Sequence, residues 1–110
     1  MTLMEKHCKP CEGGVQPLSL KEGKEYLSQL PGWELSADGK EISKMFTFKN
    51  YHQTIAFVNA VAWLSHQENH HPDMEVHYRE CRVRYSTHAI GGLSENDFIC
   101  AAKVNSLLAA

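Results

Sequence analysis

The amino-acid sequence predicts an α+β fold: a four-stranded antiparallel sheet with helices packed on one face, in the order α-β-β-α-β-β-α. Apolar residues recur at three- and four-residue spacing in three stretches, and they alternate with polar residues in four others. Two of the alternating stretches are separated by only a two-residue turn, as in a β-hairpin. The chain has 110 residues, which suits one domain with a modest core. We therefore expect a flexible N-terminal arm over residues 1–17 and a single domain over residues 18–110.

The first predicted helix begins at a capping box. The residues before it contain prolines and glycines and follow no regular period, which is why we expect an arm there. Ser19 and Glu22 are three residues apart, so the Ser19 hydroxyl can accept from the third helical amide while the Glu22 carboxylate reaches back to the amide of Ser19 itself. An apolar stripe then follows at helical spacing, formed by Leu20, Tyr26, Leu27 and Leu30. Pro31-Gly32 ends this helix.

The centre of the chain predicts two strands and the longest helix. Residues 33–35 and 42–48 alternate, with an Asp-Gly turn between them. Asn50 can cap a helix that runs to about residue 68, with a broad apolar face suited to lying on a sheet. Pro72 prevents this helix from continuing.

Residues 74–87 predict a hairpin with one apolar face. We expect its two-residue turn at Arg79-Glu80. The opposed pairs would then be Met74 with Tyr85, Val76 with Val83, and Tyr78 with Cys81. This register places every apolar side chain on the same face of the sheet. A last helix starts near Ser94, with acidic residues at its positive N-terminal end.

Composition and charge exclude several classes of function. The net charge is -2 and no segment concentrates Lys and Arg, which disfavours direct nucleic-acid binding. No apolar run is long enough to cross a membrane, and the first residues contain no signal-peptide core. We therefore expect a cytoplasmic protein whose four cysteines are free thiols.

Three histidines are the candidates for chemistry. If opposed hairpin residues sum to 159, His71 lies across from His88, and His70 is its neighbour in sequence. Histidine titrates near neutral pH, and repulsion keeps clustered imidazoles from all being charged, so the cluster can supply a proton donor and an acceptor together. Acid–base catalysis by His70, His71 and His88 is the function these residues predict.

Two segments form a recognisable signature, Glu68-Asn69-His70-His71-Pro72-Asp73 and the stretch from Tyr85-Ser86-Thr87-His88 to Asp97-Phe98. With these segments the sequence resembles the pterin-4a-carbinolamine dehydratases. Pro31-Gly32-Trp33 and Phe46-Thr47-Phe48-Lys49-Asn50 match weaker signatures upstream. The match runs from about Leu18 to near the C-terminus.

The resemblance implies the dehydration of 4a-hydroxytetrahydrobiopterin to quinonoid dihydropterin and water, which supports tetrahydropterin recycling for an aromatic amino acid hydroxylase. It implies His70, His71 and His88 as the catalytic histidines, with no metal or other cofactor. It further implies a homodimer or homotetramer, and some relatives also act as partners of a transcription factor. Further site residues are expected at Glu68, His66, Asn69, Pro72, Ser86 and Thr87. Many members have an acidic residue four positions before the first paired histidine, where this chain has His66.

Three alternative interpretations stay open. His66 and His70 have the i, i+4 spacing of zinc enzymes, but Gln67 stands where the metalloprotease motif requires glutamate. Cys8 and Cys11 form a C-x-x-C without a second pair to complete a tetrahedral metal site. A non-catalytic dimerisation or regulatory module on the same fold would show no pterin affinity and would not need the histidine cluster.

Overall fold

The computed structural model describes residues 2–10 and 15–108, and it confirms the α+β fold. The sheet is antiparallel throughout, with strand order β1-β2-β4-β3. Its strands are β1 (Glu34–Leu35), β2 (Ile42–Thr47), β3 (Asp73–Val76) and β4 (Glu80–Tyr85). The helices are α1 (Leu20–Leu27), α2 (Tyr51–Glu68) and α3 (Glu95–Leu107), with short 3-10 turns η1 (Leu3–Glu5) and η2 (His88–Ile90).

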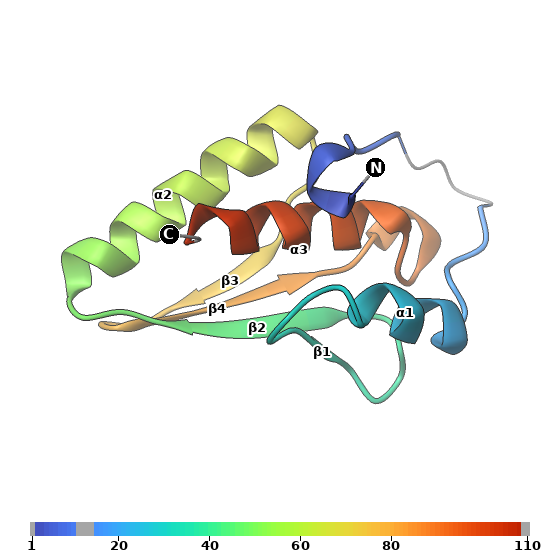
Figure 1. Ribbon diagram of the computed structural model, residues 1–110, viewed down its shortest axis with the longest axis horizontal. Coiled ribbons are helices and arrows are strands. Elements are labelled where there is room, and N and C mark those ends of the chain that lie inside the picture. Colours follow the sequence, from blue (N-terminus) through green and yellow to red (C-terminus); the bar gives the residue numbers. More distant parts are fainter. Residues whose placement is uncertain (1, 11–14, 109–110) are drawn as a thin grey trace.

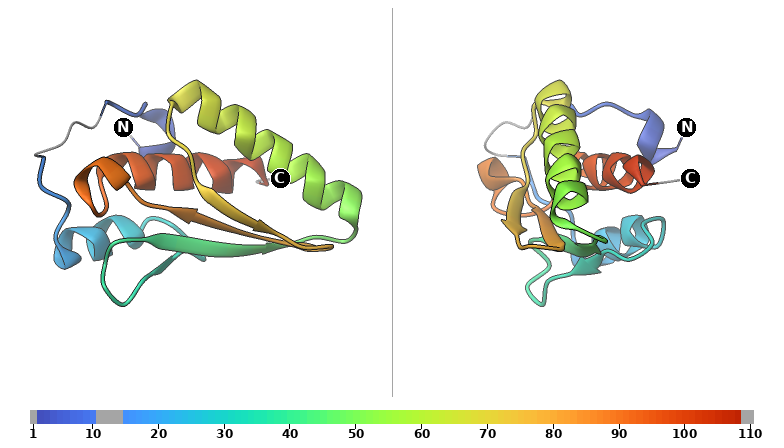
Figure 2. Two further views of the ribbon diagram at one scale, coloured as in Figure 1. Left: turned by 180° about the vertical axis from the view of Figure 1, so that it is seen from behind. Right: turned by 90° about the vertical axis from the view of Figure 1, so that its left-hand side faces the viewer.

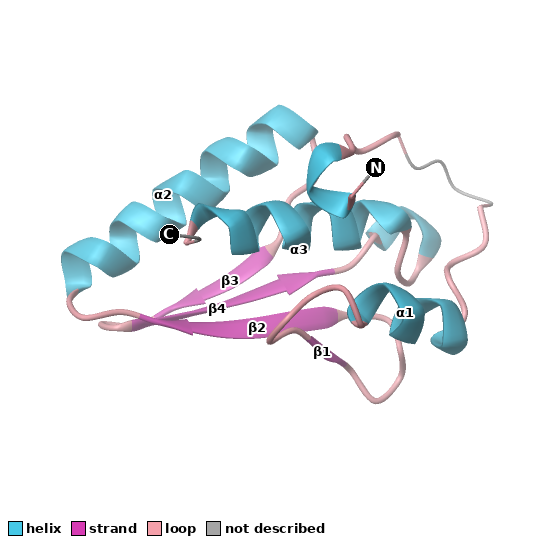
Figure 3. Ribbon diagram, in the orientation of Figure 1, coloured by secondary structure: helices cyan, strands magenta, loops and turns pink. Residues whose placement is uncertain are grey.

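The helices form a layer on one side of the sheet. In Figure 1 and Figure 3, α2 and α3 run above the strands and α1 lies near the β1 end; Figure 2 shows the same layering from behind and from the side. Between the layers lies an apolar core, to which Phe46, Phe57, Val83, Tyr85 and Phe98 contribute. No helix among the described residues is long and apolar enough to span a membrane.

The predicted helix starts are present in the structure. The Ser19 hydroxyl accepts from the Glu22 amide at 3.2 Å, and the Glu22 carboxylate accepts from the Ser19 amide at 2.9 Å. Asn50 accepts from the amide of Gln53 at 2.9 Å, so α2 begins where its cap predicts. At its other end, α2 stops at Asn69, which adopts a left-handed conformation with φ 52°. Asn69 thus ends the helix three residues before Pro72, since a left-handed residue breaks the helical hydrogen-bond pattern.

The hairpin register differs from the prediction by two residues. Val76 pairs with Cys81 and Met74 with Val83, so opposed residues sum to 157 and not to 159. The cause is the position of the turn: His77 donates to the carbonyl of Glu80 at 2.8 Å, which puts Tyr78 and Arg79 at the tip. A shift of two residues leaves each side chain on its predicted face, because side chains alternate with period two.

The apolar residues of the hairpin differ in burial although they share the predicted face. Cys81, Val83 and Tyr85 on the inner strand β4 are fully buried, whereas Val76 is 42% and Tyr78 66% exposed. β3 lies at an edge of the sheet, and Tyr78 lies beyond its end, in the hairpin turn. At the edge of a sheet, a side chain on the apolar face can therefore still be exposed to solvent.

Candidate active site

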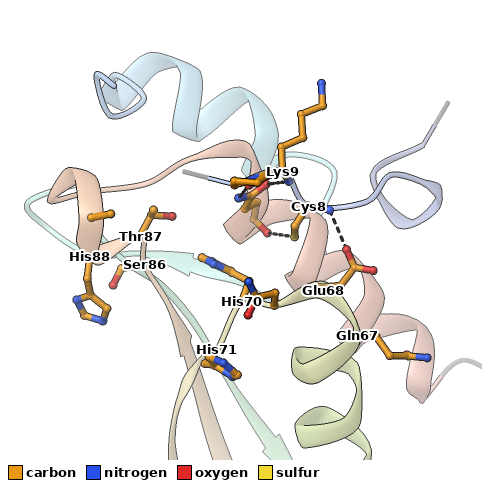
Figure 4. Close-up of a pocket in the computed structure, with 13 residues that line it drawn as sticks. Cys8, Lys9, Gln67, Glu68, His70, His71, Ser86, Thr87 and His88 are labelled. Atoms are coloured by element: carbon orange, nitrogen blue, oxygen red, sulfur yellow. Dashed lines mark hydrogen bonds between the residues drawn. The ribbon is translucent and has the colours of Figure 1, made fainter. Parts of the chain in front are cut away.

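A pocket of about 570 Å³ opens where three distant segments meet. One segment is the end of α2 with the residues after it, one follows β4, and the third is the N-terminal arm; the start of α3 also contributes to the lining (Figure 4). The lining residues are Cys8, Lys9, Pro10, Gln67, Glu68, Asn69, His70, His71, Ser86, Thr87, His88, Ala89 and Asn96. The three predicted histidines therefore border one cavity.

His70 is held in a fixed orientation. The left-handed turn at Asn69 directs the chain away from the helix axis, and the His70 amide donates to the carbonyl of Ser65 at 3.1 Å. The imidazole lies parallel to the Tyr85 ring, with centroids 5.8 Å apart and an interplanar angle of 8°. Its Nε2 lies 2.6 Å from Oδ1 of Asp97, and only 13% of the side chain is exposed. This ring can therefore orient a ligand without moving.

Asp97 is the residue that the sequence reasoning missed. Its carboxylate is fully buried, and Oδ2 accepts from the Thr87 hydroxyl at 2.8 Å and from the Ser94 amide at 2.9 Å. A buried carboxylate is costly unless its oxygens are hydrogen-bonded, and the His70 ring, the Thr87 hydroxyl and the Ser94 amide are the groups in contact with it. The available sequence signal was the Ser94-Glu95-Asn96-Asp97 capping box, which places this acid at the start of α3.

His71 and His88 are more open to solvent than His70. Both side chains are exposed, and neither ring makes a hydrogen bond with a described residue. His71 precedes β3 and His88 lies in η2, after β4 has ended, so the predicted ladder pairing of the two does not form. They nevertheless line the same pocket from its two strand-side segments (Figure 4). Their ring nitrogens are available to a bound molecule.

The remaining predicted site residues divide into two groups. Those lining the pocket are Glu68, Asn69, Ser86 and Thr87. Outside its lining are Pro72 and His66, and the His66 ring lies beside Trp63 with centroids 5.5 Å apart. Among residues 2–10 and 15–108, no three His, Cys, Asp or Glu side chains are grouped to hold a metal ion.

Glu68 anchors the N-terminal arm. Its Oε1 accepts from the Cys8 amide at 2.8 Å, and its Oε2 lies 3.0 Å from His7 Nδ1 and 3.9 Å from Lys103 Nζ. Burial by itself raises the pKa of Glu68, but these three partners outweigh it, and the net pKa is lowered. The carboxylate is therefore ionised and engaged by protein groups.

The arm forms one wall of the pocket. The Lys9 amide donates to Asn96 Oδ1 at 3.0 Å, and Asn96 Nδ2 donates back to the Lys9 carbonyl at 2.6 Å. Farther along, Leu3 is buried against the core and Lys6 pairs with Glu95 at 2.9 Å. The predicted flexibility of the arm stays a prediction, and Cys11 of the C-x-x-C lies outside the described residues. The described part of the arm makes contacts that sequence reasoning did not anticipate.

Comparisons with known proteins identify the family. The family model described as pterin 4 alpha carbinolamine dehydratase matches residues 16–107. A relative from Nitrosomonas eutropha, named "Putative pterin-4-alpha-carbinolamine dehydratase", is 67% identical over 96% of this chain and 93% of its own. One of the same name from Nitrosomonas europaea is 66% identical over 96% and 92% of the two chains.

Solved structures agree with this result. The crystal structure of a transcriptional coactivator/pterin dehydratase from Brucella melitensis has a TM-score of 0.81 and 28% identity, covering 86% of this chain and all of that one. A pterin dehydratase-like protein described as a RuBisCO assembly factor in the alpha-carboxysome has a TM-score of 0.62 and 25% identity, covering 72% and 92%. The resemblance noted from the sequence is thus confirmed, and with it the assignment to the dehydratase class of lyases. The chain belongs to the pterin 4 alpha carbinolamine dehydratase family.

Proposed function

We propose that this protein dehydrates 4a-hydroxytetrahydrobiopterin to quinonoid dihydropterin and water by acid–base catalysis with His70, His71 and His88. The observation that carries the proposal is the convergence of these three imidazoles on one pocket. One of them is fixed against a buried carboxylate, and the other two present ring nitrogens that no described residue occupies. This combination provides both a positioned group and exchangeable protons.

The chemistry requires a proton donor and a proton acceptor. Hydroxide leaves carbon poorly, so an acid must protonate the 4a oxygen while its bond to carbon breaks. The lone pair of the neighbouring ring nitrogen drives this departure, and a base then removes the proton of that nitrogen. One imidazolium and one neutral imidazole meet both needs without a covalent intermediate, and such positioned groups contribute about 10²- to 10⁴-fold.

The contacts suggest a division of roles. His71 is assigned the donor role because its ring is exposed to the pocket and makes no protein hydrogen bond. His88 lines the pocket from the segment after β4, where it can accept and share the proton. His70 orients the substrate ring, since its Nε2 is already engaged by Asp97.

Stopped-flow absorbance of freshly generated 4a-hydroxytetrahydrobiopterin tests the proposal. Wild type should accelerate the decay, while His71→Ala and His88→Ala should lose most of that acceleration and stay folded by circular dichroism. His52→Ala is the matched control, because His52 lies at the exposed start of α2, outside the pocket lining. Full turnover by His71→Ala would remove the donor role, and no acceleration by folded wild type would overturn the function.

A physiological setting belongs to the same proposal. The dehydratase would serve an aromatic amino acid hydroxylase by returning its oxidised pterin to the recycling route. A hydroxylase assay with limiting tetrahydropterin and a dihydropterin reductase should run longer when this protein is added.

We place the reaction in the cytoplasm because the described cysteines are free thiols, as in a reducing compartment. Cell fractionation checks this location.

Assembly into a homodimer or homotetramer is also proposed. The edge strand β3 exposes Val76, the turn after it exposes Tyr78, and α2 exposes Trp63 at 63%. Exposed strand edges and apolar side chains are commonly covered by another subunit. Light scattering on the eluting protein measures the mass, and a monomer at micromolar concentration would contradict this part.

A binding module is the second candidate function. Support for it comes from the neighbours, since one is described as a transcriptional coactivator/pterin dehydratase and another as a RuBisCO assembly factor. On this alternative the chain would act as a dimerisation or regulatory partner and would not bind pterin. Calorimetry with a stable tetrahydropterin distinguishes the two functions. Binding of the pterin is expected for the dehydratase, and no binding is expected for the binding module.

A further inference from the structure

Two thiols from opposite ends of the chain are in contact beside the pocket. Cys8 lies on the arm and Cys100 lies in α3, yet their Sγ atoms are 3.4 Å apart. Cys8 is half-buried and lines the pocket, whereas Cys100 is fully buried. Neither residue has a role in the proposed dehydration.

The contact results from anchors on both sides of Cys8. The Cys8 amide donates to Glu68 at the end of α2, and the backbone of Lys9 exchanges two hydrogen bonds with Asn96 on α3. The Cys8 thiol also lies 3.7 Å from the Asn96 carbonyl oxygen (Figure 4). These anchors hold the Cys8 side chain over Cys100, one turn farther along α3 than Asn96.

We propose that Cys8 and Cys100 are a redox-active dithiol, which a peroxide oxidises to a disulfide that fixes the arm wall of the pocket. The Cys8 thiolate attacks a peroxide oxygen, the O–O bond breaks, and Cys8 becomes a sulfenic acid while the second oxygen leaves as water after protonation. The Cys100 sulfur then attacks the Cys8 sulfur and displaces the sulfenic oxygen, which takes up the Cys100 proton and leaves as a second water. Two electrons pass from the two thiols to one hydrogen peroxide.

The surroundings of the two sulfurs determine which reacts first. The hydrogen bond with Cys8 and burial raise the pKa of Cys100, so its thiol stays protonated. Cys8 is also the thiol that solvent reaches through the pocket. Bond formation requires the sulfurs to approach from 3.4 Å to about 2.05 Å, and the shift falls to the arm because Cys8 lies outside any helix or strand whereas Cys100 lies within α3.

Oxidation should have a large effect on stability because the disulfide would close most of the chain into one loop. Closure of a loop of this length restricts the unfolded state strongly, so the melting temperature should rise by at least about 10 °C. The proposal depends on a covalent bond and not on turnover, so its failure is distinguishable from failure of the dehydratase proposal.

Peptide mapping after peroxide treatment tests the dithiol. The Cys11→Ser variant is treated with hydrogen peroxide, alkylated and digested with trypsin. The expected product joins residues 7–21 to residues 85–103, is lighter than the two peptides by two hydrogens, and disappears on reduction. The melting temperature should rise with oxidation and return with reduction. Cys8→Ser/Cys11→Ser is the matched control and should show neither change.

Other products would overturn the proposal. Oxidation of Cys8 to a sulfinic or sulfonic acid, with Cys100 recovered as the alkylated thiol, would mean that Cys100 does not resolve the sulfenic acid. If Cys11→Ser fails to fold, fragmentation of the cross-linked wild-type peptides locates the bonded cysteine. A bond between Cys8 and Cys11 in wild type would equally exclude the pair proposed here.

Discussion

Replacing Asp97 with asparagine should slow the dehydration and leave the protein folded. In the native site Oδ2 holds the Thr87 hydroxyl and the Ser94 amide, while Oδ1 contacts His70 Nε2 at 2.6 Å. The asparagine carbonyl can keep both donors of Oδ2, which turns the amide NH₂ toward His70. Nε2 of His70 must then accept a hydrogen bond, so the neutral ring protonated on Nδ1 is the form that fits.

The size of the effect follows from the interaction that is lost. A hydrogen bond to a charged group contributes about 1.5–3 kcal/mol net, which corresponds to roughly 10- to 100-fold in kcat/KM. The unfolding free energy should change by less, about 1 kcal/mol, because the variant no longer buries a carboxylate. Asp97→Asn thus separates orientation of His70 from folding.

Stopped-flow dehydration rates across neutral pH, with guanidinium unfolding in parallel, measure both quantities. Glu80→Gln is the matched control, since Glu80 is an exposed acid at the start of β4, away from the pocket lining. Turnover of Asp97→Asn equal to wild type would refute the argument. So would an equal loss in Glu80→Gln, because the effect would then not arise from contact with His70.

Three further predictions concern the arm and the backbone. Glu68→Gln should lower the unfolding free energy at neutral pH by about 1–2 kcal/mol. Because the pKa of Glu68 is lowered in the folded protein, its contribution to stability is present above pH 4.5 and is lost as pH falls through the folded pKa. Denaturant titrations should therefore show the unfolding free energies of wild type and variant becoming equal in acid. Leu3→Ala removes a side chain that is 5% exposed and should cost about 2–3 kcal/mol in thermal unfolding, whereas its neighbour Met4→Ala, 47% exposed, should cost little; equal losses would show that the arm does not pack as described. Gly91→Ala should cost about 1 kcal/mol by urea titration from backbone strain alone, since φ is +67° and an added Cβ meets nothing within 4 Å. Gly23→Ala, in α1 with ordinary contacts, should be neutral or stabilising, and the opposite order would contradict the strain argument.

The elements of the fold were predictable because their signals are local. The capping box at Ser19 and the cap at Asn50 mark helix starts within a few residues of sequence, and both appear in the structure. The alternation along residues 80–85 determines which side chains of β4 face the helices. The predicted side of the sheet was correct for each side chain even though the register was wrong, because a register error of two residues leaves every side chain on the same side.

The burial of β3 and the turn of the hairpin were not predictable in this way. Val76 has the pattern of a buried residue, but its exposure depends on whether another layer happens to cover that edge. The turn at Tyr78 and Arg79 satisfies a hydrogen bond between His77 and Glu80, and neighbouring turn positions fit the alternation equally well. The alternating pattern therefore does not distinguish between hairpin registers that differ by an even number of residues.

The sequence by itself determined the α+β class, the helix starts and the candidate histidines. Only the tertiary structure decided that His70 contacts Asp97, that Glu68 binds the arm, and that Cys8 meets Cys100. Each of these contacts joins residues far apart in the chain through side-chain atoms. Periodicity and caps report on neighbours within one turn or one strand, whereas such contacts depend on how whole elements pack. The buried carboxylate and the arm obtain their hydrogen-bond partners from other helices and loops of the folded chain. A local sequence pattern does not say where those helices and loops will lie.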